Sequence, residues 1–268
     1  MTAAEIRYGG RVRRRWIATI FGLAACGSVA APPTPDAPDA HDAGLDGIPT
    51  AAPPPVLVKA ARGHAAASAT LTIPLTIPGG ADRLLIVSVG VGSLCPASDP
   101  TIATVTGVSY AGTPLVRLDT IVGTPCSANV TRSEQWTQVA PALGANDVVI
   151  TLSSDAVTLH GGALAFTGVN QTTPVRASAT TSGAGTTAMA TVASAIGDLV
   201  VSSVGQGGSI TAPGSGQTAA FIQNVSNGNT LDNSAASTAV AAGPATAMSW
   251  SFGAEDEWQM IVSSLRAP

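Results

Sequence analysis

Short runs rich in Val, Ile, Leu and Thr recur at close intervals from residue 56 to residue 268, and turn-forming residues bound each run. Several runs alternate large and small side chains, as at Trp250 and Phe252, each followed by Ser or Gly. A period of two places successive side chains on opposite faces of a strand. Because no run keeps apolar residues at helical spacing, the pattern predicts strands. The predicted strands are residues 70–77, 83–91, 102–110, 115–122, 134–140, 147–152, 159–167, 198–204, 246–252 and 257–265.

The fold class that follows from this pattern is all-β. Charged residues make up 10% of the chain and aromatic residues 4%, whereas Gly alone contributes 29 residues. This usage is typical of strands joined by tight turns. Antiparallel sheets without helices cover their apolar faces with each other. Residues 56–268 are therefore predicted to form one two-layer antiparallel β-sandwich of jelly-roll type.

The first 26 residues have a different pattern. An arginine-rich stretch precedes an apolar run at residues 16–25, and small residues lead directly into Cys26. This order resembles the signal peptide and lipobox of a bacterial lipoprotein. The resemblance implies cleavage of residues 1–25, a lipid on Cys26, a place in the bacterial cell envelope and, because Gly27 replaces the Asp of inner-membrane lipoproteins, delivery to the outer membrane. A signal peptide cleaved without lipidation is the alternative, whereas a run of about ten residues is too short for a transmembrane helix.

Residues 26–55 are predicted to be a disordered tether that carries the lipidated Cys26. The segment is rich in Pro and Asp and has too little apolar surface to form a core. In polyproline geometry each residue spans roughly 3.1 Å, so the tether reaches at most about 90 Å from the membrane.

Three cysteines occur in the chain, and their odd number is informative in an exported protein. A lipid on Cys26 leaves Cys95 and Cys126, which both lie beside Pro in turn-rich stretches. We expect these two cysteines to form a disulfide in an oxidising compartment. Two buried free thiols are the alternative.

Several turn phrases of residues 70–268 are similar to those of a widespread set of bacterial secreted β-sandwich domains with no assigned activity. The phrases are residues 108–115, 134–136, 165–174 and 197–201. The resemblance implies a sandwich fold and an extracytoplasmic location. It implies no catalytic residues.

Candidate chemistry is sparse. Glu255 and Asp256 form part of an acidic cluster beside Trp258. The candidate ligand-binding residues are Glu255, Asp256, Trp258 and Trp136. Neighbouring carboxylates can bind calcium or act as acid and base in glycoside hydrolysis, and exposed aromatic rings bind sugars. A solvated turn and buried core rings are the competing interpretations. His64 and His160 are the histidines of the β domain and have no accompanying catalytic motif. The sequence predicts no catalytic residues, no cofactor and no metal site.

Charge excludes one class of partner. Removal of residues 1–25 takes away five of the twelve basic residues and one of the sixteen acidic residues, which leaves a net charge of about −8. Binding to nucleic acid requires a basic surface, so nucleic acid is not an expected partner. The sequence favours a lipid-anchored binding or structural module for polysaccharide or an envelope protein. The alternative is an extracytoplasmic hydrolase that acts on envelope or extracellular polymer.

Overall fold

The computed structural model describes residues 52–94, 103–123, 129–225 and 233–268, and these residues form strands and loops without a helix. The strands are β1 (Val56–Ile77), β2 (Leu84–Leu94), β3 (Val105–Tyr110), β4 (Thr113–Pro114), β5 (Val116–Val122), β6 (Asn129–Val139), β7 (Gly144–Thr167), β8 (Val175–Ala193), β9 (Leu199–Gln206), β10 (Ile210–Pro213), β11 (Thr218–Gln223), β12 (Asn233–Val240) and β13 (Ala245–Leu265). The all-β class and the two antiparallel sheets are confirmed.

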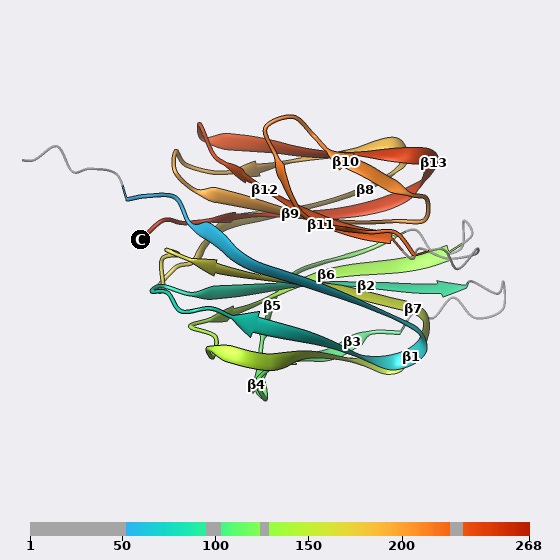
Figure 1. Cartoon of the computed structure of the whole chain (residues 1–268). Coiled ribbons are helices and arrows are strands. Elements are labelled where there is room, and N and C mark those ends of the chain that lie inside the picture. Colours follow the sequence, from blue (N-terminus) through green and yellow to red (C-terminus); the bar gives the residue numbers. More distant parts are fainter. Residues whose placement is uncertain (1–51, 95–102, 124–128, 226–232) are drawn as a thin grey trace, which may run out of the picture. The chain divides into compact units, whose positions relative to one another are not determined.

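The two sheets repeat one topology. The first sheet contains β1–β7 and has the order β4-β3-β7-β2-β6-β5, and β1 also pairs with β7. The second sheet contains β8–β13 and has the order β10-β13-β9-β12-β11, and β8 also pairs with β13. With β4 set aside, each strand of the first sheet has a counterpart in the second. The described domain therefore consists of two consecutive structural repeats, which lie one above the other in Figure 1.

The central strands of the two repeats also agree in sequence. β2 begins Leu-Leu-Ile-Val-Ser-Val-Gly at residues 84–90, and β9 begins Leu-Val-Val-Ser-Ser-Val-Gly at residues 199–205. Both strands are paired on one side with the last strand of their repeat and on the other side with β6 or β12. This correspondence relates residues 84–90 to residues 199–205 position by position.

Long bent strands fold each sheet over on itself. β1 pairs with β7 along almost its whole length, and the register shifts beside Ala67, which has a φ of 48°. β3 lies on one arm of β7 and β2 on the other arm. The two arms of the sheet therefore face each other across a core that includes Ile73, Ile150 and Leu159. β8 and β13 bend in the same way, and their core contains Trp250 and Met260.

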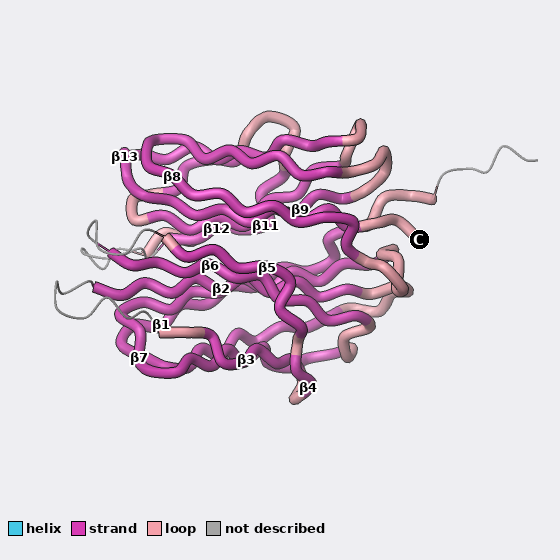
Figure 2. The backbone as a smooth tube through the Cα atoms, turned by 180° about the vertical axis from the view of Figure 1, so that it is seen from behind, coloured by secondary structure: helices cyan, strands magenta, loops and turns pink. Residues whose placement is uncertain are grey.

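A third core joins the two sheets. Alternate residues of β2 and β9 point away from the core of their own sheet, so Leu84 and Ile86 meet Leu199 and Val201 between the sheets. Further along the same faces, the residues become polar and small. Ser88 and Gly90 of β2 correspond there to Ser203 and Gly205 of β9. The layers visible in Figures 1 and 2 are thus held by three cores rather than one.

The strands define two ends of the domain. At the entry end, residue 52 leads into β1, β2 and β9 begin, and β13 finishes near the C-terminus; this is the left side of Figure 1. At the distal end, β2, β5 and β11 finish and the long strands bend. The described part of the chain enters and leaves the domain at the same end.

The predicted strands account for part of this architecture. Residues 147–152 and 159–167 are two arms of the single strand β7, and residues 246–252 and 257–265 are two arms of β13. The first half of β1, the first part of β6 and the strands β4, β8, β10, β11 and β12 were not predicted. The tether, Cys26, Cys95 and Cys126 lie outside the described residues.

Candidate functional site

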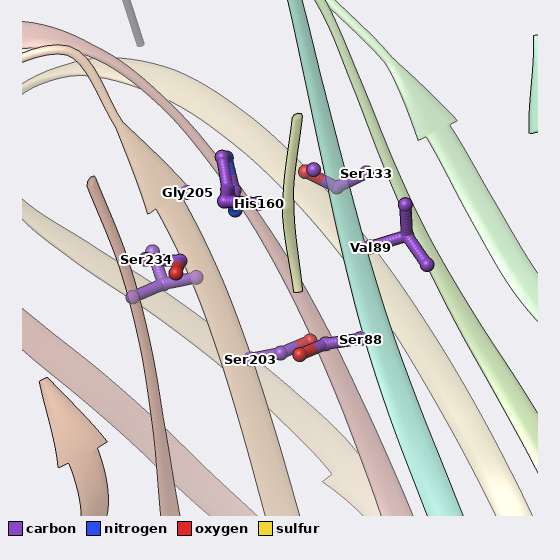
Figure 3. Close-up of a pocket in the computed structure, with 9 residues that line it drawn as sticks. Ser88, Val89, Ser133, His160, Ser203, Gly205 and Ser234 are labelled. Atoms are coloured by element: carbon purple, nitrogen blue, oxygen red, sulfur yellow. The ribbon is translucent and has the colours of Figure 1, made fainter. Parts of the chain in front are cut away.

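A small polar cavity lies between the two repeats. It is lined by Ser88, Val89, Gly90, Ser133, His160, Ser203, Val204, Gly205 and Ser234 (Figure 3). β2 and β9 contribute matching Ser-Val-Gly segments, and Ser133 of β6 corresponds to Ser234 of β12. His160 breaks this correspondence, because its counterpart on β13 is Gln259. Figure 3 shows Ser88 and Ser203 directed toward one another across the cavity.

His160 is the one ionisable group that lines this cavity. It is paired with Gly90 of β2 on one side and with His64 of β1 on the other. The side chain is only 5% exposed. Burial, together with a smaller contribution from the nearby His64, lowers the pKa of His160 to about 4. The imidazole is therefore neutral near pH 7.

The cavity has a volume of about 10 Å³, which holds about one water molecule and no organic substrate. The polar groups beside it join the two sheets. Gln135 of β6 donates a hydrogen bond from Nε2 to Oγ of Ser203 over 2.9 Å, and Oγ of Ser263 donates to its Oε1 over 2.6 Å. These bonds satisfy a buried amide. These hydrogen bonds thus hold the two repeats in one relative position. The cavity is too small for a polymer to reach His160.

A larger pocket lies at the distal end. It has a volume of about 290 Å³ and is lined by Gly123, Ser182, Gly183, Ala184, Glu257, Trp258 and Gln259. Gly123 follows β5 of the first repeat, whereas the other residues belong to β8 and β13 of the second repeat. The pocket forms where β8 and β13 bend, because their register is interrupted between Ser251 and Asp256. Its size approaches the lower limit of small-molecule sites.

Trp258 forms the floor of this distal pocket. Its indole is 9% exposed and lies against Gly183, where an added Cβ would approach Cζ2 to 2.7 Å. Glycine at residue 183 therefore makes room for the ring. The indole Nε1 is buried and has no hydrogen-bond partner among the described residues. A buried donor without a partner is costly to the fold.

The acidic residues of the distal end have different roles. Glu257 lines the pocket beside Trp258. Asp256 accepts a hydrogen bond from the backbone N–H of Glu257 over 2.7 Å, and its carboxylate lies against Gly207, so it supports the bend of β13. Glu255 is exposed at the turn. Of the two predicted carboxylates, neither lines the pocket, whereas their neighbour Glu257 does.

Trp136 does not line this pocket. It is partly buried against the core of the first sheet, and its Nε1 donates to Oε2 of Glu134 over 2.9 Å. Oε1 of Glu134 also accepts from Arg132 over 3.1 Å, and Glu134 is 1% exposed. The ring thus belongs to a buried polar network. The structure does not bring Trp136 and Trp258 together as one platform.

Sequence reasoning missed most residues that line the distal pocket. Ser182, Gly183 and Ala184 lie in a Ser-, Thr-, Gly- and Ala-rich stretch without apolar alternation, so β8 gave no strand signal. Gly123 is close to Glu257 only through the stacking of the repeats. The available signal was the acidic cluster at residues 255–257, which lies beside the pocket.

Within the described ranges, no group of three or more His, Cys, Asp or Glu residues is placed to hold a metal ion. The same residues contain no helix long and apolar enough to cross a membrane. Comparison of the chain with protein-family models, curated proteins and solved structures gives no match. The fold and the site define the described part of the chain as an all-β domain of two stacked repeats with a distal pocket at Trp258.

Proposed function

We propose that this chain is a lipid-anchored module of the bacterial cell envelope that binds a polar ligand, such as a segment of polysaccharide or of an envelope protein, in the distal pocket. Cys26 carries the lipid, and residues 27–55 form the tether. The proposal combines the lipobox-like sequence with the position of the pocket. The tether enters at one end of the domain, and the pocket opens at the other.

The observation that supports binding most directly is the distal pocket of about 290 Å³, which Trp258 and Glu257 both line. An aromatic ring and the carboxylate of Glu257 are together groups that recognise a hydroxylated ligand. Trp258 offers a buried edge to such a ligand rather than an exposed stacking platform. The pocket therefore suits a single inserted group of a polymer better than a long chain laid over a surface.

A disulfide between Cys95 and Cys126 is part of this proposal. Cys95 directly follows Leu94 of β2, and Leu94 is paired with Asn129 of β6, three residues after Cys126. The register of β2 and β6 therefore brings the attachment points of the two segments side by side. A cross-link at this position would hold the distal end together beside the pocket.

The test is a binding measurement on the processed chain with an array of bacterial envelope glycans, followed by titration of each positive glycan. Ser182→Trp places a bulky side chain at the pocket, so we expect the affinity for the glycan to fall by roughly tenfold or more. Thr187→Trp is the matched control, because Thr187 is exposed on the same strand and does not line the pocket. Binding that Ser182→Trp leaves unchanged would contradict this site.

The alternative of an extracytoplasmic hydrolase is distinguished in the same experiment. A binding module gives saturable binding without product. Release of shortened glycan that disappears in Glu255→Gln or Asp256→Asn would instead identify an enzyme at the acidic turn. Glu257→Gln separates the two cases further, because it removes a charge from the pocket. In a binding module this change should weaken glycan binding without affecting any release of product.

A further inference from the structure

Large exposed apolar side chains gather at the entry end. In the described part of the chain, Ile196 is 81% exposed, Val56 58%, Val240 56%, Leu143 49% and Val139 41%. All five lie in the turns or at the strand termini of the entry end, whereas the three other large exposed apolar residues, Val116, Val122 and Met189, belong to β5 and β8. We call these five residues the entry face.

The turns that carry the entry face are joined to one another. The N–H of Ala140 donates to the carbonyl of Arg83 over 2.9 Å, and the N–H of Gly168 donates to that of Ala81 over 3.2 Å. Gly168 lies beside Pro55, a Cβ built on it being 3.9 Å from Cα of Pro55. These contacts join the turn before β2, the turns after β6 and β7, and the lead-in to β1 into one rim.

The rim continues into the second repeat. A Cβ built on Gly197 would lie 4.0 Å from the carbonyl oxygen of Ala52, and the N–H of Gly197 donates to the carbonyl of Ala241 over 3.1 Å. These contacts join the lead-in to β1 with the turn that carries Ile196 and with the end of β12 at Val240. The tether thus reaches the domain in the middle of the entry face.

Charge differs between the two ends. Arg83, Arg176 and Arg266 lie at the entry end, where Asp198 neutralises Arg176 and the exposed Asp82 directly precedes Arg83. The bends of the distal end carry Asp155 and the acidic cluster at residues 255–257. Anionic lipid headgroups attract arginine and repel carboxylate, so this distribution favours one orientation on a bilayer.

We propose that the entry face is a membrane-docking surface that seats the domain on an anionic bilayer. Ile196 and Val240 enter the headgroup region, Arg83 and Arg266 contact lipid phosphates, and the distal pocket points away from the membrane. The exposed apolar residues, the arginines and the point of tether attachment coincide at this end. The inference rests on the proposed lipid anchor only for the location of the protein, because the surface itself consists of residues of the domain.

The test is hydrogen–deuterium exchange of the processed chain with and without vesicles of phosphatidylethanolamine and phosphatidylglycerol. We expect slower exchange at residues 139–143 and 194–198, and unchanged exchange at residues 253–257. Ile196→Ser combined with Val240→Ser should lower vesicle partitioning of the unlipidated chain by roughly tenfold. Met189→Ser is the matched control, because Met189 is 65% exposed but lies in β8, outside the entry face.

The lipid state of Cys26 is measured by mass spectrometry on the same sample, which separates the two proposals. A lipidated chain that shows no protection of the entry face on these vesicles would overturn the docking surface and leave the anchor in place. A chain without lipid that still shows protection of the entry face would support docking and overturn the anchor. Loss of protection in the double variant but not in Met189→Ser would assign docking to this surface.

Discussion

The imidazole of His160 on β7 occupies the space beside Gly90 on the neighbouring strand β2, so that a Cβ added to Gly90 would lie 1.8 Å from Cε1 of the ring. The two residues are directly paired in the sheet. Gly90 is therefore required by the size of His160 and not by a turn. The corresponding glycine of the second repeat, Gly205, faces the same cavity from the opposite sheet.

Gly90→Ala should destabilise the fold by about 3 kcal/mol, because the ring must move within a closely packed interface. Chemical denaturation measures the change in the free energy of unfolding. Gly205→Ala is the matched control. A Cβ at Gly205 would lie 3.6 Å from Cε1 of His160, an ordinary contact, so the expected change is below about 1 kcal/mol.

A double-mutant cycle tests whether His160 is the cause of the effect at Gly90. His160→Ala removes the ring that the new methyl group meets. Gly90→Ala should then cost much less in the His160→Ala background than in the native chain. Equal costs in both backgrounds would show that the glycine has another role.

Acid should weaken the domain through His160. The pKa of His160 is about 4 in the folded chain and 6.5 without burial. Between these values the unfolded chain binds more protons, so stability falls as the pH is lowered from 6.5 to about 4, by up to roughly 3 kcal/mol. Above pH 6.5 this contribution is constant. Denaturation midpoints across this range measure the effect, and His160→Gln should remove it.

Asp198 should stabilise the start of the second repeat. Burial raises the pKa of Asp198, but hydrogen bonds from Arg176, Ser264 and the N–H of Ala195 outweigh it, so the net pKa lies below 3.8. This stabilisation is complete above pH 3.8 and is lost as the pH falls through the lower folded value. Asp198→Ala should cost about 3 kcal/mol at neutral pH.

Asp198→Asn keeps an acceptor for Ser264 and Arg176 but removes the charge, so its cost should be smaller. Thermal unfolding of both variants beside the native chain compares them. An Asp198→Ala variant as stable as the native chain would show that the ion pair of the buried Asp198 with the partly exposed Arg176 does not hold β8 against β9.

Strand prediction succeeded where side chains are large and alternate. β2, with Leu84 to Val91, and the second arm of β13, with Met260 to Leu265, are rich in apolar residues, and both were predicted. β8 and β12 consist mainly of Ala, Ser and Thr, which carry little apolar signal. These strands form because larger neighbours such as Trp250 cover them. The information that places them lies in the partner strands.

The repeat and the distal pocket follow from long-range pairing. The match between residues 84–90 and 199–205 is a sequence signal for two repeats, but seven residues are a short motif in a chain rich in Val, Ser and Gly. Bends near Ala67 and Gly185 fold each of the two sheets over on itself. Gly183 meets Trp258 only after the bend forms. The sequence therefore indicated the acidic cluster beside the pocket and not the pocket.

The proposed disulfide gives a further prediction. Replacing both Cys95 and Cys126 by Ser should lower the free energy of unfolding by roughly 3 to 4 kcal/mol, because a loop of about thirty residues is then no longer closed in the unfolded chain. Peptide mapping under non-reducing conditions identifies the bond directly. Free thiols at both positions in the exported protein would contradict the pairing.

The most direct test of the account is mass spectrometry of the N-terminus of the protein purified from cell envelopes. The account predicts that residues 1–25 are absent and that Cys26 is the first residue and carries fatty acyl groups. An N-terminus upstream of Cys26, or an unmodified Cys26 thiol, would contradict the lipid-anchored module.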